Sequence, residues 1–224
     1  MPWLAIYIPK GKKLKKRRQS VVLSWVKAME RYILGISGAS GQAIGLKLLR
    51  ELLGRDFDVH LVISRHALPV IAQETGIQIG LDKPRDEETL RGGVSSGRLF
   101  RYREDEMEAP IASGSFKTKA MFIAPCSMKT LSAVAIGYAA NLLERAADVT
   151  IKEGRKLILC PREMPFSAIH LENMLKLARI GVAVAPPVAA FYQMPKNLED
   201  MVDFFAGKLL DSAGIENETF KRWR

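Results

Sequence analysis

Short apolar runs of strand length alternate with longer segments of helical spacing along most of this chain. The apolar runs fall at residues 31–37, 58–64, 119–124, 156–160 and 182–185. Helical spacing occurs at residues 44–53, 65–74, 127–138, 139–153, 167–180 and 198–213, while 76–97 resembles an irregular excursion. Continuous apolar strands that alternate with helices are typical of a parallel sheet covered on both faces. The pattern therefore predicts a three-layer, doubly wound α/β fold of the Rossmann-like or flavodoxin-like type.

The basic charge of the chain is concentrated in its first 28 residues. They hold eight lysines and arginines and no acidic residue, whereas residues 29–224 hold 26 basic and 24 acidic residues. A nearly neutral domain argues against binding to a phosphate backbone, so no nucleic-acid partner is expected. Residues 1–28 fit an upstream extension or a disordered arm, with a functional chain that starts at Met29, or else a basic nucleic-acid or nuclear-targeting tail. We expect one domain over residues 29–224.

The composition also limits the compartment and the metal chemistry. Two cysteines and three histidines exclude a disulfide scaffold and a conventional zinc module. The longest uncharged stretches, 130–143 and 180–195, are shorter than the ~20 apolar residues that a spanning helix needs. We expect a cytoplasmic protein with no membrane segment and no bound metal. The histidines and Cys126 are expected to be structural, because no pairing among them suggests a nucleophile.

The first candidate site is the loop Ser37-Gly-Ala-Ser-Gly41, which precedes a predicted helix. Such a loop either presents N–H groups to an anion or makes a tight turn that needs glycine. The dinucleotide fingerprint is incomplete, and the second strand ends in Ser64-Arg65 rather than in an acidic residue. A hydroxyl and a cation suit a phosphate better than a ribose diol. The sequence therefore favours a mononucleotide such as FMN over NAD, with more hydroxyls at Ser127 and Thr130.

Charged residues also follow the later strands, where the ligands of doubly wound folds bind. Lys152, Arg162 and Lys208 are predicted to converge on one phosphate dianion, with Tyr192 as a hydrogen-bond donor. Glu163 is the nearby titratable group for proton transfer. An alternative for residues 142–153 is a solvated helix with i,i+4 ion pairs, including one between Asp148 and Lys152.

Several segments resemble the UbiX-type flavin prenyltransferases, within the flavoprotein superfamily that also contains the flavin-dependent cysteine decarboxylases. The resemblance covers about residues 30–223. The matching segments are Gly38-Ala-Ser-Gly41, Ala112-Ser-Gly-Ser115, Pro125-Cys-Ser127, Thr130-Leu-Ser-Ala133, Asn141-Leu-Leu-Glu-Arg-Ala-Ala-Asp148, Pro161-Arg-Glu163 and Pro165-Phe-Ser-Ala-Ile-His-Leu-Glu-Asn-Met-Leu175.

The resemblance implies a metal-independent transferase that uses FMN and dimethylallyl monophosphate. Members join the prenyl group to N5 and C6 of reduced flavin, and the product is the cofactor of a UbiD-type decarboxylase. They commonly form homododecamers with their sites at subunit interfaces.

The resemblance also assigns roles to individual residues. Ser40, Glu74 and Glu163 are the implied catalytic residues, with Ser40 near flavin N5. The implied FMN contacts are Gly38, Ala39, Ser40, Ser64, Cys126, Ser127, Met128, Lys129 and Arg145. The implied contacts to the prenyl phosphate substrate are Lys152, Arg162, Tyr192, Lys208 and Trp223.

The chain departs from the family at two positions. Met107 stands where some members have tryptophan, and Lys208 stands where some have arginine, which keeps the charge but loses bidentate geometry. Two other functions were weighed, namely a flavin-dependent decarboxylase of an aromatic or cysteinyl acid and a non-catalytic flavin carrier. The cysteine decarboxylases carry a different substrate motif, and a carrier has no need of a phosphate clamp.

Overall fold

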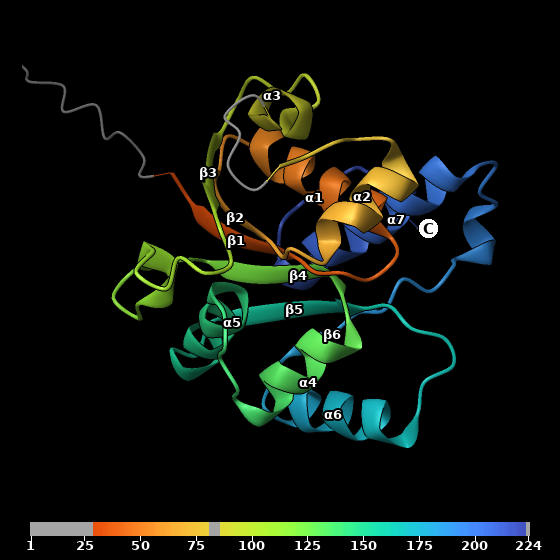
Figure 1. The fold of residues 1–224 in the computed structure, drawn as a ribbon. Coiled ribbons are helices and arrows are strands. Elements are labelled where there is room, and N and C mark those ends of the chain that lie inside the picture. The colour runs from red at the N-terminus through yellow and green to blue at the C-terminus, as the bar shows by residue number, and fades with distance from the viewer. Residues whose placement is uncertain (1–28, 81–85, 223–224) are drawn as a thin grey trace, which may run out of the picture.

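The computed structural model describes residues 29–80 and 86–222, and its centre is a parallel sheet. The six strands have the spatial order β3-β2-β1-β4-β5-β6 (Figure 1). They are β1 (Arg31–Ile36), β2 (Asp58–Ile63), β3 (Arg98–Tyr102), β4 (Ala120–Cys126), β5 (Lys156–Pro161) and β6 (Ala183–Val184). The predicted doubly wound α/β fold is confirmed. The predicted extension, residues 1–28, lies outside the described residues.

Helices cover both faces of this sheet (Figure 1). One face carries α1 (Gln42–Gly54), α2 (Ala67–Thr75), α3 (Asp86–Arg91) and α7 (Leu198–Ala213). The other face carries α4 (Met128–Ile136), α5 (Leu142–Lys152) and α6 (Ala168–Arg179). Two short 3-10 helices, η1 (Pro110–Ala112) and η2 (Phe191–Gln193), lie in the connections. Each face of the sheet therefore has its own apolar core.

Polar side chains define where several helices begin. Ser127, Asn141, Ser167 and Asn197 precede α4, α5, α6 and α7, and each side chain accepts an N–H of the first turn. Such caps satisfy donors that a helix cannot pair internally. At α6 the cap is reciprocal, because Nδ1 of His170 accepts the N–H of Ser167 (3.2 Å). His170 is therefore structural, as the sequence predicts.

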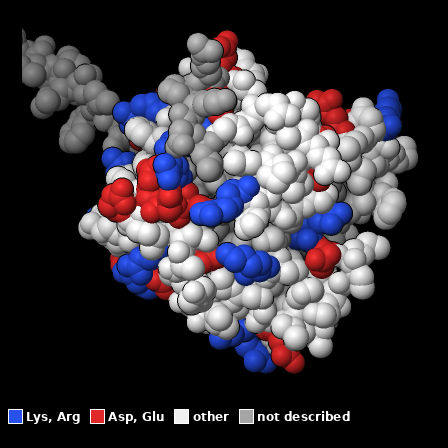
Figure 2. Space-filling view, in the orientation of Figure 1, with Lys and Arg blue, Asp and Glu red and all other residues white. Residues whose placement is uncertain are grey.

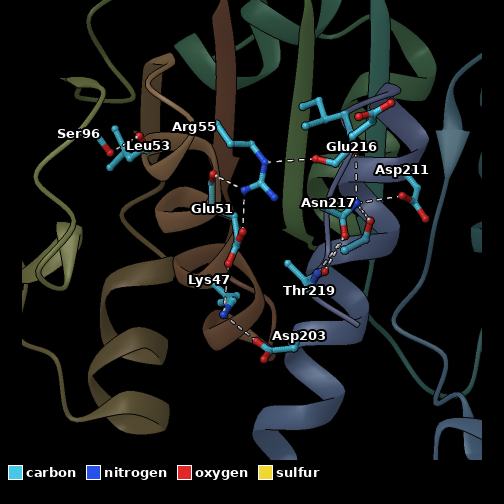
Figure 3. A network of polar contacts seen from close by, with 12 residues as sticks. Lys47, Glu51, Leu53, Arg55, Ser96, Asp203, Asp211, Glu216, Asn217 and Thr219 are labelled. Atoms are coloured by element: carbon cyan, nitrogen blue, oxygen red, sulfur yellow. Dashed lines mark hydrogen bonds and ion pairs between the residues drawn. The ribbon is translucent and has the colours of Figure 1, made fainter. Parts of the chain in front are cut away.

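Charged residues are interspersed on the surface and join the two helices that pack most closely on one face. In Figure 2, acidic and basic side chains lie beside one another on the face shown, in line with the nearly neutral domain. Lys47 of α1 pairs with Asp203 of α7 (2.8 Å), and Arg55 donates to the carbonyl of Glu216 (3.4 Å; Figure 3). Across the described residues, none of the helices combines the length and apolar character that a membrane crossing requires.

The structure adds two elements that the sequence did not predict. Residues 76–97 were expected to be irregular, but they contain α3, and β3 follows directly. β3 is an edge strand without the continuous apolar run of a buried strand. Side chains of other elements hold this strand in register. Arg98 makes two hydrogen bonds to Asp58 of β2 (2.7 and 2.6 Å), and Arg101 pairs with Asp86 of α3 (3.3 Å). Such long-range partners cannot be read from local periodicity.

His60 lies on β2 within an aromatic cluster. Its ring stacks on Phe100 (4.8 Å between centroids), and its Nδ1 lies 2.9 Å from the hydroxyl of Tyr102. Burial lowers the pKa of His60 to about 4, and the nearby Arg31 and Arg98 act in the same direction. The folded protein thus holds this imidazole in its neutral form.

His60 should make the protein less stable in mild acid. The unfolded chain takes up this proton near pH 6.5 and the folded chain only near pH 4, so stability falls as the pH drops between these values. The linkage amounts to about 2 kcal/mol of unfolding free energy between pH 7 and pH 5. Urea denaturation at both pH values, on the wild type and on His60→Phe, measures it. Equal losses in the two proteins would contradict the assignment.

Candidate active site

The strand order reverses between β1 and β4, which creates a crevice at the carboxyl ends of these strands. Ser37 joins the two sides. Its buried hydroxyl donates to the carbonyl of Pro125 (2.9 Å) and accepts the N–H of Ser127 (2.7 Å). The N–H groups of Met128 and Lys129 belong to the first turn of α4, and within the described chain no acceptor contacts them. The start of α4 is therefore available to an anion.

The loop between β1 and α1 is shaped by the side chain of Gln42. This amide is fully buried, and its Nε2 donates to the carbonyl oxygens of Ser37 (2.9 Å) and Ala39 (2.6 Å). In a trans peptide, the N–H that follows a carbonyl points the opposite way. The N–H groups of Gly38 and Ser40 are therefore directed away from Gln42, which leaves them as donors for a ligand.

The start of α1 already holds a carboxylate. Glu74 of α2 accepts the N–H groups of Gly41 (3.0 Å) and Gln42 (2.8 Å), where the helix dipole favours a negative charge. These two N–H groups are not free for a phosphate, so the anion-binding interpretation of the loop is wrong at this end. The tight-turn interpretation applies to Gly38, because a Cβ there would lie 2.8 Å from the Cβ of His66.

Ser64 supplies a polar atom that lacks a partner. It directly follows β2, and its N–H donates to the carbonyl of Ile36 at the end of β1 (2.9 Å). Its Oγ is buried and has no hydrogen-bond partner among the described residues. Buried hydroxyls are nearly always paired, so this atom indicates a ligand or water at the crevice.

The two cations beside the crevice are already paired with carboxylates. Arg65 donates to Glu104, and the ammonium of Lys129 lies 2.7 Å from the buried carboxylate of Glu144. Glu144 also accepts the N–H of Ala140 (3.0 Å). The two cations border a cavity of about 270 Å³, lined by Arg65, His66, Glu104, Asp105, Lys129, Ala140 and Asn141.

A second group of predicted residues lies around the ends of β5 and β6. Arg162 and Glu163 directly follow β5 and are exposed, and the N–H of Arg162 donates to the carbonyl of Cys126 (3.1 Å). Lys208 of α7 borders a cavity of about 250 Å³, and the ring of Tyr192 lies 6.2 Å from that of Phe204 in its wall. The cavity is lined by Cys160, Ala185, Pro186, Pro187, Val188, Phe204, Phe205, Lys208, Leu209 and Ser212.

Lys152 does not join this group within one chain. It ends α5, just before β5 begins, whereas Arg162 follows the end of β5. A six-residue strand spans about 20 Å, so Lys152 lies at the amino ends of the strands and Arg162 lies at their carboxyl ends. The predicted convergence of Lys152 with Arg162 and Lys208 is therefore wrong for a single chain. Lys152 instead pairs with Glu153 (2.5 Å).

Arg145 and Asp148 lie near the start and middle of α5. Asp148 pairs with Arg145 (2.8 Å) rather than with Lys152, so the expected i,i+4 pair is absent from the described residues. Arg145 also donates to the carbonyl of Ala112 in η1 (3.2 Å). The guanidinium thus links α5 to η1.

Cys126 belongs to the core beneath the site rather than to its surface. Its side chain is fully buried, and burial raises the pKa of its thiol far above the usual range, which keeps it protonated. Burial also raises the pKa of Cys160 to about 12. The sequence-based contact of Cys126 with FMN is therefore not supported for its side chain. In the part of the chain described, no three His, Cys, Asp or Glu side chains form a group that could hold a metal.

Three residues at the crevice received no individual role from the sequence, although Ser37 lies in the candidate loop. Gln42 shapes that loop, Ser37 joins β1 to β4, and Glu144 holds Lys129. Gln42 directly follows the glycine loop, which is a weak signal, whereas the helical pattern around Glu144 did not reveal its role. Trp223, a predicted site residue, lies outside the described residues.

Known proteins match this chain both as a broad family and as closer relatives. Residues 25–210 match the family model described as Flavoprotein, so the chain is a member of that family. A flavin prenyltransferase UbiX from Halalkalibacterium halodurans is 46% identical over 192 residues, which are 86% of this chain and 92% of that protein. The chain belongs to the UbiX-type flavin prenyltransferases and is a transferase.

Solved structures similar to this chain include two UbiX-like proteins. The dodecameric FMN-dependent UbiX-like decarboxylase from Escherichia coli O157:H7 has a TM-score of 0.77 and 43% identity, covering 87% of this chain and 99% of that one. AnUbiX in complex with FMN and dimethylallyl pyrophosphate has a TM-score of 0.79 and 37% identity, covering 88% and 98%.

Proposed function

We propose that the protein transfers a dimethylallyl group from dimethylallyl monophosphate to N5 and then C6 of reduced FMN. The observation that carries this proposal is the apolar cavity bordered by Lys208, which lies at the same edge of the sheet as the crevice between β1 and β4. A small apolar space beside a cation suits a short prenyl phosphate. The product would then serve a UbiD-type decarboxylase.

The crevice residues fit the two ends of FMN. The unpartnered hydroxyl of Ser64 and the free N–H groups at the start of α4 suit its phosphate, beside Ser127, Met128 and Lys129. The carboxylate of Glu74 disfavours a phosphate at α1. We therefore assign the flavin ring to the N–H donors of Gly38 and Ser40, with Ala39 between them. Arg145 is proposed as a further FMN contact.

Reduced flavin would supply the electron-rich nucleophile for an allylic carbon. As the allylic C–O bond breaks, the phosphate leaves with the electron pair. Arg162, Lys208 and Tyr192 would stabilise this developing charge, which is where preorganised donors contribute most to rate. Exposed Glu163 and Glu74 are proposed to move protons, and the contribution of Trp223 stays a prediction.

The site is proposed to be completed by a second copy of the chain. α6 buries Leu177 alone and exposes Leu171 and Leu175, which lie one turn apart on one face, an apolar surface of the kind that marks an interface. Lys152 lies at the amino ends of the strands, away from the phosphate site of its own chain. We therefore propose that it contacts the phosphate bound by a neighbouring subunit. We propose a homododecamer, the assembly of the similar protein from Escherichia coli. A cytoplasmic location stays a prediction.

The function is tested by anaerobic incubation with reduced FMN and dimethylallyl monophosphate, followed by mass spectrometry of the released flavin. We expect a gain of one C5H8 unit, which Arg162→Ala and Glu163→Gln should lose. Glu88→Gln, at an exposed position of α3 on the other face of the sheet from α5, is the matched control. Unchanged flavin on a loaded, folded protein would refute prenyl transfer, and release of CO2 from a cysteinyl or aromatic acid would then favour the decarboxylase. A parallel reaction with dimethylallyl pyrophosphate identifies the preferred donor.

Gln42→Met should weaken FMN binding while leaving the chain folded. Its amide makes two hydrogen bonds to loop carbonyls, and their loss is worth about 1–3 kcal/mol, or roughly a 5- to 150-fold rise in Kd. Fluorescence titration of FMN measures the effect. Gln73→Met, at an exposed position of α2, is the matched control. Equal affinity of the two variants would show that Gln42 does not position the loop.

A further inference from the structure

The last described residues, 217–222, form a strap that lies directly on α7. Asn217 donates to the carbonyl of Gly207 (3.2 Å) and to the carboxylate of Asp211 (2.9 Å), next to Thr219 (Figure 3). Arg222 makes two hydrogen bonds to the same carboxylate (2.8 and 3.1 Å). The contact is too close for a side chain at Gly207, because a Cβ there would overlap Thr219 Oγ1.

The strap also contacts η2, which carries Tyr192. Gln193 donates through its Nε2 to the carbonyl of Lys221 (2.8 Å). The ring of Phe220 lies 5.0 Å from that of Phe204, and Phe204 lies 6.2 Å from Tyr192. The hydrogen bond of Gln193 therefore joins η2 to the strap, and Phe204 of α7 lies between the rings of Tyr192 and Phe220.

The strap and Lys208 share one carboxylate. The ammonium of Lys208 lies 3.6 Å from Asp211, the residue that anchors Asn217 and Arg222. Arg222 lowers the pKa of Asp211, so this carboxylate stays ionised and available to all three partners. The strap thus touches the supports of both Lys208 and Tyr192 without being part of the cavity wall that Lys208 borders.

We propose that the strap is a positioning element for the prenyl phosphate. It holds η2 against α7 and orients Lys208 through Asp211, so that Tyr192 and Lys208 meet the same phosphate. The proposal rests on the proposed function, because it assumes that these two residues bind the phosphate. A strap that served folding alone would change stability but not the Michaelis constant for the prenyl donor.

Gly207→Ala displaces the strap without changing its sequence. We expect the KM for dimethylallyl monophosphate to rise about tenfold, the effect of losing one hydrogen bond to a charged group. The Kd for FMN should stay within about twofold, because the crevice shares no partner with the strap. Gly54→Ala is the control, since a Cβ at that helical glycine meets nothing within 4 Å. Faster tryptic cleavage after Lys221 reports the displacement.

Gln193→Ala provides a second variant that leaves α7 intact. It removes the hydrogen bond between strap and η2, and it should raise the same KM in the same direction. In a Lys208→Ala background, Gly207→Ala should raise the KM by a smaller factor than in the wild type, because the part of its effect that passes through Lys208 is already lost. A normal KM in Gly207→Ala with a displaced strap, or in Gln193→Ala if Gly207→Ala does not fold, would overturn the proposal. A wild type that transfers no prenyl group would instead overturn the proposed function.

Discussion

Mixed oligomers of Lys152→Ala and Arg162→Ala subunits should regain the prenyl transfer that each variant lacks alone. Each substitution removes a proposed charged contact to the phosphate and should slow the reaction about 10- to 100-fold. In one chain the two residues lie at opposite ends of β5, so in the proposed oligomer each complete site would draw them from different subunits. Random mixing then restores about a quarter of the sites, each with Arg162 from one variant and Lys152 from the other.

The measurement uses co-expression of the two variants with different affinity tags and tandem purification of the mixed species. A matched control pairs Arg162→Ala with Lys208→Ala. These two residues lie at the same edge of one chain, so mixing them should restore nothing. Activity in the control, or none in the Lys152 mixture, would contradict a site shared between subunits.

Gly45→Ala in α1 should markedly lower the stability of the folded protein, although it adds only one methyl group. A Cβ at Gly45 would overlap the carbonyl oxygen of Ala124 on β4 and lie 3.1 Å from a methyl of Ile36. The helix would have to move away from the centre of the sheet, where overpacking costs about 1–3 kcal/mol or more. For a domain of this size, that corresponds to a fall in Tm of about 2–12 °C.

Gly54→Ala, at the last residue of the same helix, is the control for this effect. A Cβ there contacts nothing within 4 Å, so the change should be neutral or should stabilise the protein by up to about 1 kcal/mol. Denaturant titration of both variants compares them directly. Equal stability would show that α1 does not approach β4 as closely as the structure indicates.

The sequence by itself determined the class of fold. The central strands, β1, β2, β4 and β5, are mostly apolar, and the helices between them repeat with a period near 3.6 residues. These patterns are local, so they can be recognised without knowing which elements pack against one another. They also placed the Gly38–Ser40 loop, Ser64 and the start of α4 at one edge of the sheet, because parallel strands all end there.

Tertiary structure decided everything that depends on a distant partner. β3 is a polar edge strand whose register comes from Asp58 and Asp86, and Glu74 fills the start of α1 from another helix. Lys152 is another example, because α5 runs antiparallel to the strands and so carries Lys152 to their amino ends, away from Arg162 and Lys208. Periodicity reports which face of an element is buried, but not which side chain meets it, because pairing across the fold depends on the path of the whole chain.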